Sequence, residues 1–254
     1  MNVFNAAAQE PAPPLLWTVR YGVISAVVSQ HPAARSLQLY GEWAEAEIDL
    51  LSSVLQERQT VLQFGGEYGA HTLWLARVVG DAGKIYVAEP ARIGFQQLCA
   101  TAALNGLTNV YTLNQWLGRT GAPTSLSRLA GGAALKCETD ETVRPIAVDD
   151  LGLDALSLLK INVTGSTIPL LEGAVETVRK HRPVIYARLE PEQALAEVKA
   201  IKELGYRCWS HAPHMYNPGN ILGQHDNVFP GRVLQNVIAM PVEGGTTFEQ
   251  LMEI

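Results

Sequence analysis

The sequence predicts an α/β fold: a doubly wound, mostly parallel sheet that ends in an antiparallel C-terminal hairpin. The first observation behind this prediction is the alternation, from residue 59 onward, of short apolar segments with longer amphipathic segments of helical period. The second is the end of the chain, where two strand-like segments, 206–212 and 236–242, flank a turn-rich insert instead of a helix. Strands joined by crossover helices are parallel, whereas strands joined without a helix can pair antiparallel.

Each predicted element follows from its residue pattern. Runs rich in Val, Ile, Leu, Phe and Tyr predict buried strands at 60–65, 83–90, 109–115, 156–163 and 183–190. Apolar residues at helical spacing predict helices at 70–79, 92–106, 167–181 and 191–205. Pro191 and Gly205 stand at the two ends of the last helix, in positions that these residues favour. Residues 117–143 are rich in Gly, Ser and Thr and predict loops with at most one edge segment.

Size and composition indicate one large domain with a short N-terminal annex. The chain has 254 residues, a mass of 27.6 kDa and 47% hydrophobic residues, which is enough for one substantial core. We expect residues 1–57 to form an N-terminal arm and helical annex, and residues 58–254 to form the α/β domain.

Within the annex, the Pro-rich segment 11–14 predicts an irregular arm that packs on the body or on a partner. Residues 41–57 predict an amphipathic helix because apolar side chains recur on one face. We expect Glu45 and Glu47 to lie on its solvated side, where acids near a helix start suit the helix dipole.

The charge balance argues against nucleic acid and anionic membranes as partners. The formal net charge is -6 and the pI is near 5.5, whereas such partners need clustered Lys and Arg. The apolar run 21–30 is shorter than the roughly 20 residues that span a bilayer, and the first residues lack the pattern of a cleaved signal. We therefore expect a cytoplasmic protein that is not integral to a membrane.

The cysteines and the aspartate pair give no sign of a metal site. Cys99, Cys137 and Cys208 are far apart and form no C-x-x-C pair, which indicates reduced thiols. Asp149 and Asp150 have no further ligand at useful spacing, so we expect them to cap the next turn.

A glycine-rich turn, GGEYG at 65–69, follows the first predicted strand. In a doubly wound sheet, ligands bind at the carboxyl ends of the strands, where this turn is expected. Gly65, Gly66 and Gly69 allow positive φ or the close approach of a ligand, and the next helix presents free N–H groups. The turn therefore predicts a site for a nucleotide-like cofactor, with a tight turn that holds no ligand as the alternative.

Glu89 strengthens the prediction of a cofactor site. It ends the second predicted strand, 22 positions after Glu67, near the offset of roughly 20 at which a carboxylate accepts a ribose hydroxyl. Turn and acid together fit a dinucleotide or S-adenosylmethionine, but the G-x-G-x-x-G spacing of dinucleotide sites is missing. Trp116, after the third strand, is placed either to stack on an adenine or to serve as a core residue.

From about residue 20 to residue 242, the chain resembles the FkbM-type class I S-adenosylmethionine-dependent methyltransferases. The resemblance rests on SLQLYGEWAEAEIDLL, GGEYGAHTLWLA, IYVAEP, FQQLCATAALNGLTNV, LLKINVTGSTIPLLEGAVETVRKHRPVIY and YNPGNILGQHDNVF. It implies a Rossmann-like, seven-stranded sheet of the class I methyltransferase type and commonly O-methylation of a sugar or natural-product hydroxyl. It also implies S-adenosylmethionine at the GGEYG turn, with contacts from Gly65, Gly66, Glu67, Gly69 and Glu89.

The chain departs from this family at acidic positions. The family pattern D-x-G-x-N-x-G has Asp at Gln63 and Asn at Glu67, and K-I-D-x-E-G has acids at Asn162 and Thr164. Asn162 cannot act as a base, and Thr164 is a poor ligand for hard cations. Glu67 should repel the carboxylate of the cofactor unless its side chain points away or is paired. These departures favour a weakened or lost cofactor site.

Catalysis by this chain would depend on other side chains. Methyl transfer from a sulfonium is intrinsically facile, so positioning can supply much of the rate. Lys160, beside Asn162, is a candidate for orienting the substrate, with a side chain that reaches solvent as the alternative. The candidate bases are His71, His211, His214 and Glu190.

Two hypotheses follow. The first is an O-methyltransferase that binds S-adenosylmethionine and modifies a hydroxyl of a small molecule or glycan. The second is a catalytically inactive relative that keeps the fold as a structural or scaffold subunit, with a protein partner or a second copy at the N-terminal arm.

Overall fold

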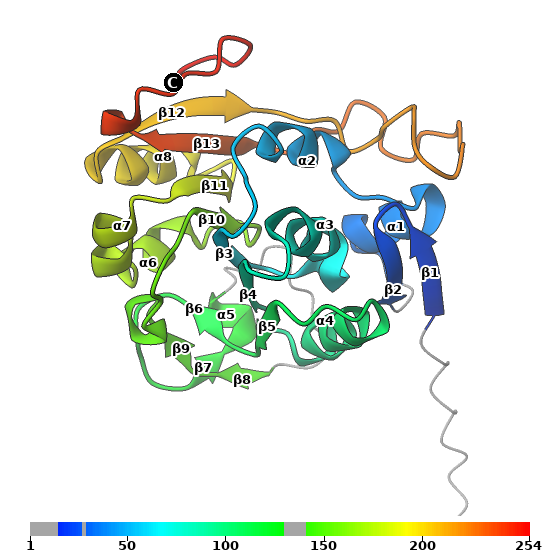
Figure 1. Ribbon diagram of the computed structural model, residues 1–254, viewed down its shortest axis with the longest axis horizontal. Helices are drawn as coiled ribbons and strands as arrows, with labels where there is room; N and C mark the ends of the chain where they lie inside the picture. Colours follow the sequence, from blue (N-terminus) through cyan, green and yellow to red (C-terminus); the bar gives the residue numbers. More distant parts are fainter. Residues whose placement is uncertain (1–14, 27–28, 130–140) are drawn as a thin grey trace, which may run out of the picture.

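The main sheet has the architecture that the sequence predicts. The computed structural model describes residues 15–26, 29–129 and 141–254. Its seven-stranded sheet has the order β12-β13-β11-β10-β3-β4-β5, as Figure 1 shows. Strand β13 is antiparallel to β11 and β12, whereas β11, β10, β3, β4 and β5 are parallel to one another. The bounds are β3 Thr60–Phe64, β4 Lys84–Ala88, β5 Val110–Leu113, β10 Leu158–Ile161, β11 Val184–Arg188, β12 Tyr206–His211 and β13 Asn236–Pro241.

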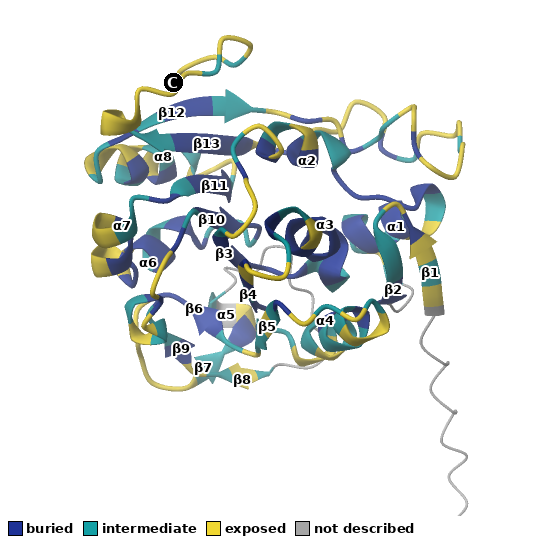
Figure 2. Cartoon of the chain, viewed as in Figure 1, coloured by how far each residue is buried: buried dark blue, intermediate teal, exposed yellow. Residues whose placement is uncertain are grey.

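Helices cover both faces of the sheet, and alternate strand residues point to opposite faces. Val61 contributes to the core beneath α2 (Glu45–Leu51), α3 (Ala70–Val79) and α4 (Arg92–Leu104). Its neighbour Leu62 contributes to the core beneath α6 (Thr167–Glu172), α7 (Val175–His181) and α8 (Ala194–Glu203). Figure 2 shows the central strands β3 and β10 in the buried colour, whereas the edge strand β5 is partly exposed. The strands are apolar on both sides because a doubly wound sheet is buried on both faces.

One predicted helix is broken. Instead of a single helix over 167–181, α6 ends at Glu172 and α7 begins at Val175. Gly173 lies at the break, and a Cβ there would stand 2.2 Å from the backbone oxygen of Gly118. Another chain segment therefore passes too close for any side chain at this point.

The segment after β5 contains more structure than expected. The third strand ends at Leu113, and β6 (Trp116–Leu117) pairs with β9 (Pro145–Ile146) instead of continuing it. A second small ladder joins β7 (Thr124–Ser125) to β8 (Thr142–Val143). The short helix α5 (Leu126–Leu129) follows β7 directly in sequence.

The N-terminal annex is a hairpin and two helices packed on the α/β body. Strands β1 (Leu15–Val19) and β2 (Gly22–Ala26) pair antiparallel, and α1 (Pro32–Tyr40) and α2 follow. The predicted annex helix is shorter than 41–57 because only Glu45–Leu51 is helical. Backbone atoms of β2 bond to α4, where Ser25 N–H donates to Thr101 Oγ1 at 3.1 Å. The annex is thereby fixed beside the glycine turn.

Some expectations concern residues that the structure does not describe. The Pro-rich segment 11–14 and Cys137 lie outside the described residues, whereas Cys99 and Cys208 are free thiols. Within the described ranges, no helix is both long and apolar enough to cross a membrane.

The close approach of α4 to the glycine turn yields a test of the packing. Gly69 has φ 92°, and a Cβ there would stand 2.8 Å from Thr101 Cγ2. We predict that Gly69→Ala lowers the free energy of unfolding by about 2–4 kcal/mol, from left-handed backbone strain and from overpacking against α4. Gly152→Ala is the matched control, because Gly152 has φ 59° and nothing within 4 Å of its Cβ position. Urea denaturation should show a loss of only about 1–2 kcal/mol for the control; equal losses would contradict the prediction.

Candidate functional site

The glycine turn lies at the carboxyl end of β3 and takes left-handed backbone conformations. Gly65 and Gly69 have φ of 90° and 92°, as their lack of a side chain allows. Glu67 and Tyr68 also have positive φ, 45° and 64°. Such angles are uncommon for residues with a side chain and persist where the surroundings hold them. The contacts of Glu67, described below, provide that support.

Glu89 lies beside the turn, as the sequence predicts, and each of its carboxylate oxygens accepts one backbone N–H. One oxygen accepts the Gly66 N–H at 2.9 Å and the other accepts the Ala91 N–H at 3.1 Å. The side chain is 7% exposed, and this burial raises the pKa of Glu89 to about 7. The acid that would hold a ribose is therefore bonded to backbone donors of its own chain.

Two buried amides converge on the carbonyl of Gly65. Gln63 Nε2 donates to this oxygen at 2.9 Å, and Asn162 Nδ2 donates to it at 2.8 Å. The opposite ends of the two amides are satisfied as well, by Thr72 Oγ1 at 3.0 Å and by Lys160 Nζ at 2.6 Å. A carbonyl oxygen has two lone pairs, so the turn carbonyl has no acceptor capacity left.

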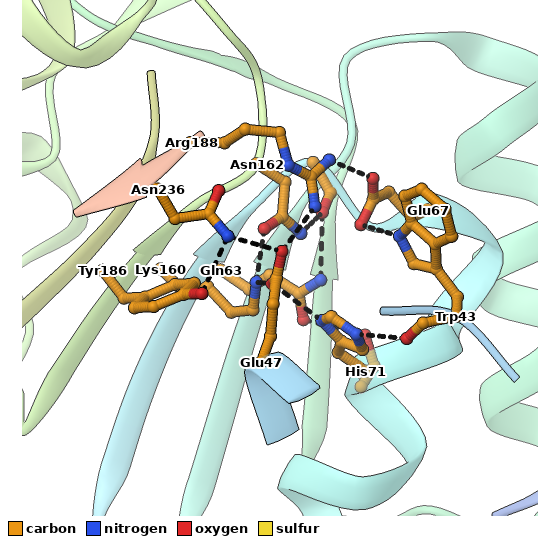
Figure 3. A network of polar contacts seen from close by, with 12 residues as sticks. Trp43, Glu47, Gln63, Glu67, His71, Lys160, Asn162, Tyr186, Arg188 and Asn236 are labelled. Carbon is orange, nitrogen blue, oxygen red and sulfur yellow. Dashed lines mark hydrogen bonds and ion pairs between the residues drawn. The ribbon is translucent and has the colours of Figure 1, made fainter. Parts of the chain in front are cut away.

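Four charged side chains form a buried, electrically balanced cluster beside these amides (Figure 3). Glu47, from α2, accepts from Lys160 Nζ at 2.7 Å and from Arg188 Nη2 at 3.1 Å. Arg188 also pairs with Glu67, whose second oxygen accepts the Trp43 indole N–H at 3.0 Å. Glu47 and Lys160 are fully buried. Two carboxylates and two cations thus neutralise each other beside the glycine turn.

The charges of the cluster support one another. Burial alone would raise the pKa of Glu47, but Lys160 and Arg188 hold it far below its ordinary value. For Glu67, burial is likewise outweighed by Arg188, which lowers the pKa of that carboxyl. Burial acts to lower the pKa of Arg188, yet Glu67 and Glu47 raise it. Both carboxylates are therefore ionised at neutral pH.

One sequence expectation for these residues is wrong, because Glu47 does not lie on the solvated side of its helix. Lys160 is fully buried, which excludes the alternative in which its side chain reaches solvent. Lys160 instead lies 5.0 Å from the centre of the Tyr186 ring as well as against Glu47. The expectation that Glu67 repels unless paired is resolved, because it is paired with Arg188.

The histidines proposed as bases have structural partners. His71 is buried, its Nε2 lies 2.8 Å from the Trp43 carbonyl oxygen, and burial lowers its pKa to about 4. His211 Nδ1 is bonded to the Tyr186 hydroxyl at 2.7 Å, and burial lowers the pKa of His211 as well. His214 forms an isolated β-bridge with Val233. Of these three, His71 lies next to the cluster, with its Nδ1 3.6 Å from Glu47 Oε2. His211 is linked to it through Tyr186, whose hydroxyl accepts from Asn236.

Trp116 and Glu190 lie apart from the cluster. Trp116 is 2% exposed and packs edge-on against Phe64, with ring centres 5.3 Å apart. This packing favours the core role over stacking on an adenine. The Glu190 backbone N–H donates to Glu197, and burial raises the pKa of the Glu190 side chain.

Sequence reasoning missed several members of the cluster, namely Trp43, Tyr186, Arg188 and Asn236. Arg188 carried a usable signal, because a cation within an otherwise apolar, buried strand demands a buried partner. Asn236 donates to both Glu47 and the Tyr186 hydroxyl, at 2.9 and 2.8 Å. The sequence near Asn236 gives no comparable indication.

Acceptors around the glycine turn are engaged within the chain. The Gly65 carbonyl is filled by two amide donors. Glu47, Glu67 and Glu89 each accept hydrogen bonds from groups of this chain as well. A hollow of about 10 Å³ lies in the annex, and a groove of about 590 Å³ lies along α8. Neither is lined by the glycine turn or by Glu89.

Comparison with known proteins places the fold. No protein-family model and no curated protein matches the chain. Solved methyltransferases do match. Precorrin-6y C5,15-methyltransferase from Geobacter metallireducens is 13% identical over 77% of this chain and 88% of its own, with a TM-score of 0.52. Methyltransferase FkbM from Methylobacillus flagellatus is 13% identical over 84% of this chain and 56% of its own, with a TM-score of 0.50. A SAM-dependent methyltransferase from Aquifex aeolicus is 18% identical over 82% and 93%, with a TM-score of 0.46. The chain has the class I methyltransferase fold.

The buried cluster predicts a large cost for removing one of its charges. Glu47→Gln leaves the buried Lys160 without its counter-charge and leaves Arg188 with Glu67 alone, so we expect the free energy of unfolding to fall by about 3–5 kcal/mol. Glu203→Gln is the matched control, since Glu203 pairs with Lys199 at 3.7 Å on the exposed surface. It should change stability by about 0.5 kcal/mol or less. Guanidinium titrations at pH 7 that gave similar small losses for both variants would contradict the role of the cluster.

Glu89 predicts a dependence of stability on pH. Its pKa is about 7 in the folded protein against an ordinary value of 4.5, so the folded state binds the proton more tightly. Stability from this group is complete below pH 4.5 and is lost as pH rises through 7. We expect Glu89→Gln to gain about 3 kcal/mol relative to the original chain between pH 4.5 and 8. Urea titrations across this range test it, and parallel stability profiles for the two proteins would contradict it.

Proposed function

We propose that this chain is a catalytically inactive relative of the FkbM-type class I methyltransferases that serves as a structural or scaffold subunit. The observation that carries the proposal is the saturation of the Gly65 carbonyl by Gln63 and Asn162. A site for a cationic methyl donor must offer acceptors. Here the chain's own amide groups donate to the Gly65 carbonyl, which leaves that oxygen no lone pair for a ligand.

The departures from the family pattern support this proposal because they replace hydrogen-bond acceptors at the site with side chains that can donate. Aspartates at positions 63 and 162 would present only acceptors and could not donate to the turn carbonyl when ionised. Gln63 and Asn162 each present a donor, and both donors face Gly65. With amides in place of the two acids, the glycine-turn edge of the sheet no longer presents negative charge to a cation. Its side chains instead donate hydrogen bonds to the Gly65 carbonyl.

The contacts at the cluster also disfavour catalysis. Asn162 is not basic, and its oxygen accepts from Lys160. The Lys160 ammonium is used by Glu47 and Asn162, which leaves little capacity to orient a substrate. His211 is bonded to Tyr186 and has a lowered pKa, so it is a weaker base than an ordinary histidine.

Methyl transfer from S-adenosylmethionine to a hydroxyl of a small molecule or glycan is the second candidate function. The position of Glu89 favours it, since the acid lies within 2.9 Å of the glycine-turn backbone. For this function, the Glu89 carboxylate would accept a ribose hydroxyl with the lone pairs that the Gly66 and Ala91 N–H groups leave free.

Cellular context belongs to the same proposal. We propose a cytoplasmic protein without nucleic-acid partners, in keeping with its net charge of -6. A structural subunit needs a partner, and we propose a protein or a second copy that binds the N-terminal arm.

Calorimetric titration with S-adenosylmethionine and with S-adenosylhomocysteine tests the loss of cofactor binding. We expect no saturable heat from either compound, because the acceptors that they need are occupied. Micromolar binding, about -8 kcal/mol, that Glu89→Ala abolishes would contradict the proposal and support the enzyme.

A variant with the family residues restored provides the positive arm of this experiment. Gln63→Asp, Glu67→Asn, Asn162→Asp and Thr164→Glu together remove the two donors from the Gly65 carbonyl and free Arg188 from Glu67. We expect this variant to gain binding that the original chain lacks, with Glu89→Ala in the same background as its control. Circular dichroism establishes that each variant is folded before the titration.

A further inference from the structure

The hairpin of β1 and β2 has one edge that is closed by a helix. Strand β2 lies between β1 and α4, as Figure 1 shows. On the side away from β1, the Val23 N–H donates to Asn105 Oδ1 at 3.0 Å, and Asn105 Nδ2 donates to the Val23 carbonyl at 2.6 Å. The Ser25 N–H donates to Thr101 Oγ1 on the same side, at 3.1 Å. Side chains of α4 therefore satisfy the outer backbone groups of β2.

The other edge of the hairpin, on β1, is open. In an antiparallel pair, two residues directly opposite each other either bond to one another or both turn their backbone groups outward. Thr18 is opposite Val23 and Leu16 is opposite Ser25, so the N–H and C=O groups of Leu16 and Thr18 face away from β2. Within the described part of the chain, no group bonds to them. Leu16 is 59% exposed, and Figure 2 shows β1 largely in the exposed colour.

The sequence of β1 does nothing to protect this edge. Natural edge strands commonly carry a charged residue, a proline or a bulge that prevents pairing with another chain. Strand β1 reads LLWTV, without charge or proline, and its register with β2 is uninterrupted. A two-stranded hairpin is also only marginally stable alone and gains from further strands. The open edge is therefore a template for another extended strand.

The free groups of β1 are complementary to those of a second β1. We propose that two copies of this chain associate through β1, paired antiparallel about a two-fold axis at Trp17. In this register, Leu16 of each copy is opposite Thr18 of the other copy. Each such pair exchanges two hydrogen bonds, so the two pairs use every free N–H and C=O of Leu16 and Thr18 in both copies.

The neighbouring registers of the same pairing are poorer. A shift of two residues in one direction places Thr18 opposite Pro14, which has no N–H to donate. A shift of two residues in the other direction places Leu16 opposite Arg20, whose N–H already donates to the Gly41 carbonyl at 2.8 Å. A shift of one residue would bring forward groups that are bonded to β2. The register centred on Trp17 is thus favoured by the bonds already made.

This association deepens the function proposed above and rests on it for its role, because a structural subunit needs a partner. The contact itself does not depend on whether the glycine turn binds a cofactor. Calorimetry with S-adenosylmethionine reads the glycine turn, whereas the experiments below read association. Failure of either proposal can therefore be told from failure of the other.

Sedimentation velocity across a range of protein concentrations tests the association. An interface built on one pair of strands is small, so we expect a reversible dimer with a Kd of roughly 100 µM. Thr18→Pro should raise the Kd at least about tenfold, because proline lacks the N–H and the two-fold symmetry removes two hydrogen bonds at once. In the monomer that N–H has no partner among the described residues, so the fold should survive, and circular dichroism checks this.

Thr18→Val is the matched control, because valine keeps the N–H and suits a strand. It should leave the Kd within about twofold of that of the original chain. An original chain that stays monomeric up to about 1 mM would overturn the proposal. Equal Kd values for the Pro and Val variants would also overturn it, because another surface would then carry the contact.

Disulfide formation between two exposed positions tests the register. Opposite residues that exchange hydrogen bonds have Cα atoms about 5.5 Å apart, within the range of a disulfide, whereas positions offset by two residues lie beyond about 7 Å. Under mild oxidation, a mixture of the Leu16→Cys and Thr18→Cys variants should give a disulfide dimer whose mass contains one chain of each. Each variant alone should give several-fold less, with the native cysteines as a common background. Equal yields from the mixture and from either variant alone would contradict the register.

Discussion

The ion pair between Glu47 and Lys160 is the constraint on which the rest of the site depends. Lys160 is fully buried in the central strand β10, where an unpaired cation would be strongly destabilising. Its counter-ion comes from α2, which is 113 residues away in sequence. Arg188, from the next strand, needs the same carboxylate and recruits Glu67 as well. The annex, the sheet and the glycine turn are therefore held together by one balanced set of charges.

Under the function proposed above, a methyltransferase fold loses the use of its cofactor edge while its core stays intact. The two hydrophobic layers depend on apolar strand residues that play no part at the edge. At the edge itself, Gln63, Asn162 and Arg188 supply donors to groups that a cationic ligand would otherwise engage. In the proposed inactive relative, contacts within the chain replace ligand contacts, although His71 Nδ1, Arg188 Nε and Asn236 Oδ1 are buried without a hydrogen-bond partner among the described residues.

Local patterns in the sequence predict the fold better than they predict the site. Strand and helix periodicity gave the sheet and its hairpin, and Glu89 lies beside the turn where its spacing placed it. The break at Gly173 could not be foreseen, because it results from the approach of a distant backbone segment. The burial of Glu47 also depends on a contact that is distant in sequence. An acid at a helix start is expected to be solvated unless the buried cation that it contacts, here Lys160, is known.

Native mass spectrometry of the protein as purified from cells tests the central claim most directly, because a functional class I site often retains its cofactor or the product of it. We predict the mass of one chain, 27.6 kDa, or of a whole multiple of it, with no adenosyl adduct. An adduct with the mass of S-adenosylmethionine or S-adenosylhomocysteine that disappears in Glu89→Ala would contradict it. The edge of the sheet would then open to a ligand despite its internal hydrogen bonds.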